Sequence, residues 1–247
     1  MKIIFLGTNG WYSSKTGDTA CILIDSKDYY IVLDAGNGIY KLDEYILKDK
    51  PIFLFISHFH LDHVSGLHIL SKFKFSQGLN LCVPKERVEA LNTLFNAPFT
   101  VGVKDLKLKV NIKETIEGEN DFGFKVTRFE MFHAYRNFGY RFELEGKTIS
   151  YSGDTGICEN SYKLAQNVDL LIHECSFQIG HEKTAWGHVT PIEAANLAKD
   201  ANVKKLILTH FDPTSYTTLE KRYEAEEAAK EIFENTTAAK DDMIINL

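Results

Sequence analysis

Cysteine is scarce in this sequence, and its spacing excludes one class of protein. The 247 residues contain four cysteines, and no two of them form a CxxC pair. Disulfide-stabilised scaffolds need denser cysteines than this. We therefore expect no disulfide framework but buried thiols in a reducing compartment, and the four residues are Cys21, Cys82, Cys158 and Cys175.

Long apolar runs and linker-like segments are also missing. The opening segment, MKIIFLGTNG, contains a short apolar run that ends at Gly7, which is too short for a signal sequence or a membrane span. No tract rich in proline, glycine or serine divides the chain. We therefore expect a cytoplasmic protein without membrane contact, folded as one α/β domain over residues 1–247.

Positive charge is the third shortage. The chain has 28 lysines and arginines against 34 aspartates and glutamates, which gives a formal net charge of −6. An acidic surface repels polyanions, so we do not expect long nucleic acids as partners. A phosphate substrate would need local positive charge, and bound metal ions are one way to supply it.

The sequence does contain a series of apolar runs that are rich in β-branched and aromatic residues, as buried strands are. These predicted strands cover residues 3–7, 20–25, 29–36, 51–57, 79–84, 124–133, 140–154, 168–176 and 204–211. Apolar residues at i, i+3 and i+4 spacing predict helices elsewhere. The predicted helices cover residues 62–73, 85–95, 191–201 and 217–233. The chain thus shows strands followed by helices in both halves.

Polar residues end several of the predicted strands. Three runs of the second half have a histidine or an aspartate at their last or next-to-last position, namely His133, Asp154 and His210. His58 follows the run at 51–57 in the same way. Ligand sites of open α/β sheets form beyond the carboxyl ends of strands. We therefore expect these side chains to point toward one common rim.

Three of the nine histidines lie with an aspartate in the six-residue segment HFHLDH. His58 and His60 are two residues apart and point the same way on an extended segment. Asp62 and His63 come where a helix is predicted to begin, and they face a second point nearby. Imidazoles and carboxylates at this density suit Zn²⁺ or a related divalent ion. The alternative is a solvated polar loop.

The order of the motifs resembles the metallo-β-lactamase superfamily over nearly the whole chain. The motifs are DAG, HFHLDH, FHAYRNFGYR, YSGDTG and LTHF. The resemblance implies an αββα sandwich, in which two mixed β-sheets pack face to face with helices outside. It also implies two divalent metal ions, with Zn²⁺ expected and Mn²⁺ or Fe²⁺ as alternatives. The implied ligands are His58, His60 and His133 for one ion and Asp62, His63 and His210 for the other, with Asp154 bridging both and Asp34 orienting the turn.

Within the superfamily, FHAYRNFGYRF resembles the ribonuclease Z branch, in which GYR follows a ligand histidine. Two later elements, HECSF and GHVTPIEAA, resemble the HEAT and HST elements of that branch. The departures from its pattern are Cys175, Ser176 and Val189. The resemblance places Glu174 and His188 beside the scissile group. From the residues alone, Glu174 is equally well a buried acid paired with a neighbour, and His188 a histidine that caps the following helix.

One departure concerns the substrate. Members of the branch that process tRNA generally carry a long, basic, glycine-rich arm before the bridging aspartate, yet only twenty residues separate His133 from Asp154 here. The opening GTNGWYSS also differs from the GTSAGxPT pattern of those enzymes. Together with the acidic charge, this favours a small phosphodiester, such as a nucleotide or a short oligonucleotide, over tRNA. The resemblance further implies a homodimer.

The leading hypothesis is a metal-dependent hydrolase of phosphodiester bonds, in which hydroxide held by the two metals attacks phosphorus. Asp62 would orient the hydroxide, and His188, positioned by Glu174, would protonate the leaving oxygen. One alternative is hydrolysis of a carboxyl ester, thioester or lactone at the same centre. Another is a non-catalytic metal- or ligand-binding module. Three aromatic residues near the motifs either stack a nucleobase or belong to the core: Trp11, Tyr12 and Phe211.

Overall fold

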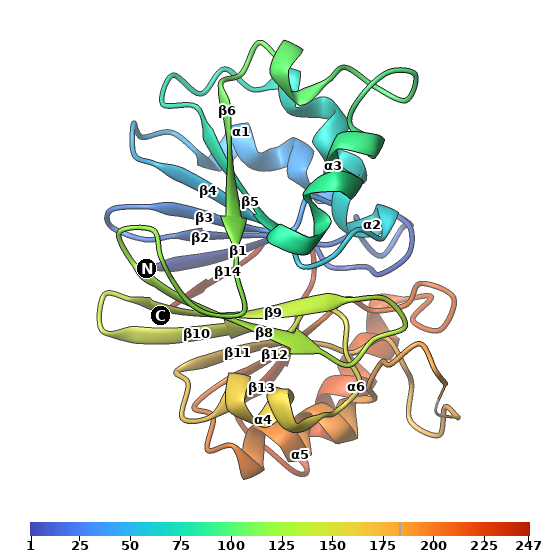
Figure 1. The fold of residues 1–247 in the computed structure, drawn as a ribbon. Coiled ribbons are helices and arrows are strands. Elements are labelled where there is room, and N and C mark those ends of the chain that lie inside the picture. The colour runs from blue at the N-terminus through green and yellow to red at the C-terminus, as the bar shows by residue number, and fades with distance from the viewer. Residues whose placement is uncertain (183) are drawn as a thin grey trace.

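Two β-sheets form the centre of the molecule. The computed structural model describes residues 1–182 and 184–247, and over these residues each sheet has seven strands. The sheets pack face to face, and helices cover both outer faces (Figure 1). This arrangement confirms the predicted αββα sandwich. One outer face carries α1 (Leu42–Tyr45), α2 (Leu61–Val64) and α3 (Val88–Leu94), and the other carries α4 (Glu159–Ala165), α5 (Pro191–Asp200) and α6 (Leu219–Lys230).

The first sheet is built mainly from the first half of the chain. Its strand order is β14-β1-β2-β3-β4-β5-β6. The strands are β1 (Lys2–Gly7), β2 (Cys21–Asp25), β3 (Tyr30–Leu33), β4 (Ile52–Phe55), β5 (Leu79–Pro84), β6 (Val110–Thr115) and β14 (Met243–Asn246). Strands β3 to β6 are parallel, whereas β1 runs antiparallel to both of its neighbours. The pairing of β1 with β14 brings the first and last strands together.

The second sheet comes from the second half of the chain, in the order β13-β12-β11-β10-β9-β8-β7. Its strands are β7 (Gly118–Asp121), β8 (Lys125–Met131), β9 (Asn137–Leu144), β10 (Lys147–Tyr151), β11 (Leu170–Glu174), β12 (Leu206–Thr209) and β13 (Thr236–Ala238). Strands β7 to β10 form an antiparallel meander, and β10 to β13 are parallel. Each half of the chain thus ends its parallel strands toward the edge where the predicted ligands lie.

Both faces of the sheets are buried, which explains the continuous apolar runs in the sequence. In β1, Ile3 and Phe5 join the core between the two sheets, whereas Ile4 and Leu6 face the helices of the first half. Phe55 of β4 packs edge-on against Tyr140 and other rings of the second sheet. A third apolar cluster lies between the second sheet and its helices. This packing fixes the two sheets against each other and therefore fixes the edge they share.

The structure corrects two details of the predicted elements. The helix predicted at 62–73 is regular only over α2, and Ser65–Lys72 forms a 3₁₀ helix. The run at 140–154 is a β9–β10 hairpin rather than one strand. Its two-residue turn consists of Glu145 and Gly146, whose φ angles of 53° and 73° match the twist of a tight hairpin.

The structure also bears on the expectations about disulfides and membrane spans. No disulfide joins the four cysteines, which are all in described parts of the chain. Among the described residues, no helix has the length and apolar character that a membrane crossing requires. The expectation that residues 1–247 fold as one domain stays a prediction.

Candidate metal centre

The HFHLDH segment leaves the end of β4 and turns into α2. His58 and His60 lie on the same side of the extended backbone, and Phe59 between them packs against the apolar core. His60 is the last extended residue, with φ −64° and ψ 145°, and the helix begins at the next position. Asp62 and His63 therefore lie in its first turn. The alternation along the strand and the turn into the helix aim four polar side chains at one edge.

Asp34 holds this turn in place from the end of β3. Its side chain is fully buried and accepts hydrogen bonds from the backbone N–H of Ser57 at 2.7 Å and from the Ser57 hydroxyl at 2.8 Å. It also contacts His63 Nδ1 at 2.8 Å and accepts a hydrogen bond from the Tyr151 hydroxyl at 2.7 Å. The bond to Nδ1 turns Nε2 of His63 toward the edge of the sheets. These contacts suit the orienting role expected for Asp34, which stays a prediction.

The structure brings the seven predicted ligands together at the carboxyl ends of strands from both sheets. They form two groups that share Asp154, and the donor atoms within each group lie within 4.8 Å of one another. One group contains His58, His60, His133 and Asp154, and the other contains Asp62, His63, Asp154 and His210. Their separation in the sequence is overcome by β4, β10 and β12, which all end at this edge. The side chains that the resemblance assigned to each ion thus lie together, and their role as metal ligands stays a prediction.

Burial sets the protonation state of the first group. It lowers the pKa of His58 well below its ordinary value and also lowers the pKa values of His60 and His133. The three imidazoles are thus neutral near pH 7, and a neutral imidazole has the nitrogen lone pair that a metal ion needs.

The second group has an excess of carboxylates around its histidines. Burial opposes the charge on His63, but Asp154, Asp62 and Asp34 raise its pKa well above the ordinary value. His63 and His210 in turn lower the pKa of Asp154, against the effect of its own burial. A buried cluster of this kind attracts positive charge, which a divalent ion supplies.

Within the two ligand groups, two buried atoms have no hydrogen-bond partner among the described residues, and these atoms test whether the site suits a metal. They are Nε2 of His58 and Oδ1 of Asp154. In addition, the Nε2 atoms of His63 and His210 face each other at 2.9 Å, and each lies 3.2–3.3 Å from Oδ1 of Asp154. Buried polar atoms are normally hydrogen-bonded, so converging donors without partners fit cation ligation. The residues present are thus suited to hold divalent ions.

Glu174 and His188 form a buried pair next to the second group. Glu174 Oε1 lies 2.6 Å from His188 Nδ1 and accepts a hydrogen bond from the backbone N–H of Thr155 at 2.9 Å. Its Oε2 accepts from the N–H of Ser176 at 3.0 Å. Burial opposes the charge on the imidazole, but Glu174 raises the pKa of His188 to about 9. Glu174 thus positions His188 and links it to the loop that carries Asp154.

Sequence reasoning missed several contacts that complete the site. The hydroxyl of Ser176 contacts His210 twice, at the ring Nδ1 and at the backbone carbonyl oxygen, both at 2.9 Å. The backbone N–H of Trp11 donates to Asp62 Oδ2 at 2.8 Å, although the HFHLDH motif gives no sign of this loop. Gly10 lies so close to His210 that an added Cβ would be 2.6 Å from its ring. The close approach explains a glycine at this position.

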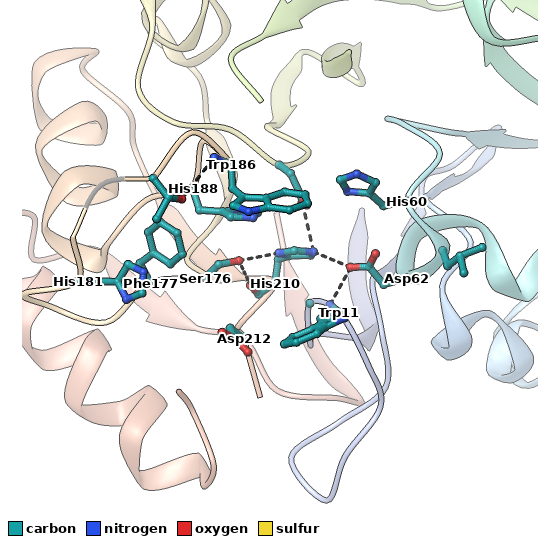
Figure 2. Close-up of a pocket in the computed structure, with 14 residues that line it drawn as sticks. Trp11, His60, Asp62, Ser176, Phe177, His181, Trp186, His188, His210 and Asp212 are labelled. Atoms are coloured by element: carbon teal, nitrogen blue, oxygen red, sulfur yellow. Dashed lines mark hydrogen bonds and ion pairs between the residues drawn. The ribbon is translucent and has the colours of Figure 1, made fainter. Parts of the chain in front are cut away.

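A cavity of about 670 Å³ opens beside the donor groups. Figure 2 shows Trp11 and Trp186 in this cavity together with His60, Asp62, His188 and His210. The aromatic residues noted in the sequence differ in their exposure. Trp11 is exposed in the cavity, whereas Phe211 is fully buried and packs against Tyr216. Phe211 therefore belongs to the core and cannot stack a base.

Comparison with known proteins supports the same relationship. The family described as "Beta-lactamase superfamily domain" matches residues 29–211. Two curated relatives carry the name ribonuclease Z. The protein of Archaeoglobus fulgidus is 29% identical over an alignment of 316 residues that covers 100% of this chain and 97% of the relative. That of Listeria monocytogenes serotype 4b is 30% identical, with coverage of 98% and 97%. Both alignments are longer than this chain, so the relatives contain segments without a counterpart here.

Solved structures show the same fold. The metallo-beta-lactamase fold protein YhfI of Bacillus subtilis superimposes with a TM-score of 0.83 at 23% identity, over 99% of both chains. The short form of human tRNase Z superimposes with a TM-score of 0.77 at 25% identity, over 100% of this chain and 99% of the other. The chain therefore belongs to the beta-lactamase superfamily, in the branch of metal-dependent hydrolases that includes ribonuclease Z.

Proposed function

We propose that this hydrolase cleaves phosphodiester bonds in small nucleotides or short oligonucleotides at a centre of two divalent metal ions, with Zn²⁺ as the expected metal. The observation that carries the proposal is the pair of four-donor groups that share Asp154 beside an open cavity. Seven residues arranged around two ions leave positions for water and substrate, as catalytic metal sites do.

Each group has a separate task. His58, His60 and His133 would hold one ion, and Asp62, His63 and His210 the other, with Asp154 between them. When bound, such a pair of ions neutralises phosphate oxygens and makes water more acidic, which raises the supply of nucleophile near neutral pH. Asp62 lies at the cavity wall, where its carboxylate can orient a water molecule toward phosphorus. The Trp11 N–H fixes Oδ2 of that carboxylate.

His188 is placed to give a proton to the leaving oxygen. It lines the cavity, and its Nδ1 is held by Glu174, so that Nε2 is left for the substrate. An alkoxide is a poor leaving group, and general acid catalysis typically contributes about 10²- to 10⁴-fold in rate. Glu174 is fully buried and acts through His188 as a positioning residue.

The first experiment compares two substrates with different leaving groups. His188→Ala should lower kcat/KM for an alkyl phosphodiester about 10²- to 10⁴-fold, but much less for bis-p-nitrophenyl phosphate, whose leaving group hardly needs a proton. His181→Ala is the matched control, because His181 lines the same cavity but stacks on Phe177 instead of pairing with Glu174. An equal loss on both substrates would exclude the acid role of His188.

The size of the substrate is supported by what surrounds the centre. The β9–β10 turn spans only Glu145 and Gly146, which leaves no arm between His133 and Asp154. None of the described residues that line the cavity is a lysine or arginine. Because the phosphate backbone of a long nucleic acid is held mainly by such side chains, a small substrate suits this site better.

The second experiment compares substrate classes on metal-supplemented protein. We expect hydrolysis of dinucleotides and other short diesters at a higher kcat/KM than cleavage of a precursor tRNA. Efficient cleavage of the precursor tRNA would assign the chain the substrate named for human tRNase Z. Turnover of lactones or thioesters without turnover of phosphodiesters would contradict the proposal.

The homodimer, expected from the resemblance, and the cytoplasmic location, expected from the sequence, also remain proposals. A homodimer predicts twice the chain mass of 28.1 kDa in light scattering. A cytoplasmic location predicts recovery of the protein in the cytosolic fraction of cells that produce it.

A further inference from the structure

The two tryptophans of the chain both lie at the same cavity. The sequence contains only Trp11 and Trp186, and both line the space beside the donor groups. Trp11 is 68% exposed and Trp186 is 52% exposed, which is high for the largest apolar side chain. Exposed aromatic rings gathered in one cavity mark a ligand surface.

The backbone holds Trp11 next to the second donor group. Its N–H bonds Asp62, and its φ of 58° is a left-handed conformation that a bulky residue rarely adopts. Asn9 anchors the same loop by hydrogen bonds from its side chain to the carbonyls of Tyr12 and Gly17. A strained conformation that persists in a tightly bonded loop points to a functional position.

Trp186 lies next to the first donor group. Its ring centroid is 6.1 Å from that of His60 and 6.4 Å from that of His133. The exposed ring of Tyr135 lies 6.3 Å away and extends the same aromatic surface. The carbonyl of Trp186 accepts a hydrogen bond from the N–H of Ala134 at 3.1 Å, which ties the indole to the loop that carries His133.

Each indole thus accompanies one of the two donor groups that meet at Asp154. In the view of Figure 2, Trp11 and Trp186 lie on opposite sides of His210. A phosphate held near Asp154 has two ester oxygens, and its substituents leave in different directions. One substituent can therefore reach each indole.

We propose that the cavity binds a dinucleoside monophosphate, with one nucleobase stacked on Trp11 and the other on Trp186. This inference rests on the proposed phosphodiesterase function and names its substrate class. An indole ring can stack on any nucleobase, so this surface discriminates ligands by how many bases they carry more than by which bases these are. A second phosphate would meet no lysine or arginine among the described lining residues, and it would lie in a cavity whose wall includes Asp212. The described lining therefore favours a single phosphate between two bases.

Fluorescence tests each stacking position separately. Trp11→Phe and Trp186→Phe each leave one tryptophan, and the metal-supplemented variants are mixed rapidly with adenylyl-3′,5′-adenosine before turnover. We expect quenching of the remaining tryptophan in both variants. Adenosine 3′-methyl phosphate and adenosine 5′-methyl phosphate carry one base each, and each should quench a different tryptophan. Quenching of one tryptophan only by the dinucleotide, or of the same one by both methyl esters, would overturn the proposal.

Kinetics provide the second readout. Trp11→Ala and Trp186→Ala should each raise KM for the dinucleotide roughly 5- to 100-fold, with a smaller change in kcat, and the phenylalanine variants should restore most of the affinity. For the wild-type protein, a dinucleotide that carries an additional 5′-phosphate should have a higher KM than the dinucleotide without it. Tyr223→Ala is the control, because Tyr223 is an exposed aromatic residue of α6 that lies outside the cavity lining.

The two levels of the hypothesis fail in different ways. If the wild-type protein hydrolyses the dinucleotide but the alanine variants keep its KM, the stacking inference is wrong and the phosphodiesterase function stands. If the dinucleotide quenches both tryptophans but no phosphodiester is hydrolysed, the proposed function is wrong and the binding surface stands.

Discussion

At the scale of single residues, Asp34 connects three parts of the chain that meet at the donor groups. Its carboxylate contacts Ser57, His63 and Tyr151 through four hydrogen bonds of 2.7–2.8 Å. A carboxylate can accept all four, whereas an amide offers one acceptor oxygen and an NH₂ group that would face other donors. The chemistry of Asp34 is therefore needed although it contributes to neither donor group.

We predict that Asp34→Asn weakens metal binding about 10- to 100-fold, because His63 loses the partner that orients its ring. Competition with a chromophoric chelator measures this affinity directly. Asp28→Asn changes an exposed aspartate and serves as the matched control. Unchanged metal affinity in Asp34→Asn would show that the turn keeps its geometry without the carboxylate.

The sequence predicted the residues whose position follows from local spacing. The HFHLDH segment shows its pattern within six residues, and strand alternation with a following helix is enough to direct His58 and His60. Trp186 and Ser176 were not predicted as site residues, since their contacts with His60, His133 and His210 arise only when separate loops pack together. The 3₁₀ segment after α2 was also missed, because 3₁₀ and α helices share nearly the same apolar spacing.

At the scale of elements, the β1–β2 loop forms part of the wall of the site. Gly10 lies against the His210 ring, and the next residue bonds Asp62, so this loop touches two donors of the second group. Among the described residues, no comparable contact joins this loop to His58, His60 or His133 of the first group. A change in the loop should therefore affect one group more than the other.

We predict that Gly10→Ala removes or weakens binding at one of the two proposed ion positions, because its Cβ would be 2.6 Å from Cε1 of His210 and would displace that ring. The metal content of dialysed protein, measured by elemental analysis, should fall from two ions per chain toward one. Gly102→Ala is the control, since Gly102 has an ordinary φ of −60° and a nearest neighbour at 3.2 Å. A stoichiometry that stays at two would place His210 outside the metal ligands.

At the scale of the whole molecule, an ion pair between a buried arginine and a partly exposed glutamate joins the two halves. Arg128 of β8 is fully buried, and its guanidinium donates to both carboxylate oxygens of Glu86 at 3.0 Å. Arg128 also lies over the ring of Phe138 and donates to the carbonyl of Thr115 at 2.8 Å. Glu86 belongs to the segment before α3, so the pair spans from the second sheet to the helices of the first half.

The pair should make stability depend on pH in the acid range. The hydrogen bond from Arg128 lowers the pKa of Glu86 from its ordinary 4.5. The stabilisation is therefore complete above the unfolded-state pKa and is lost as the pH falls through the folded-state pKa. Glu86→Gln should lower the free energy of unfolding by about 1 kcal/mol at pH 7, a value discounted because solvent reaches the carboxylate, and by less at about pH 3.5.

Urea denaturation at both pH values measures this difference, and a single transition is expected if residues 1–247 form one domain. Glu89→Gln is the control, because Glu89 is an exposed glutamate of the neighbouring α3. A loss of stability that is the same at both pH values would mean that the Glu86 charge does not contribute.

The donor groups lie beyond the ends of β4 of the first sheet and of β8, β10 and β12 of the second, with His210 directly after β12. A polypeptide interrupted anywhere before residue 210 would lack one donor of the second group, however well its first half had folded. We therefore expect that fragments ending before His210 cannot assemble the complete second group, and that this group forms only after both halves of the chain have been made and have packed together.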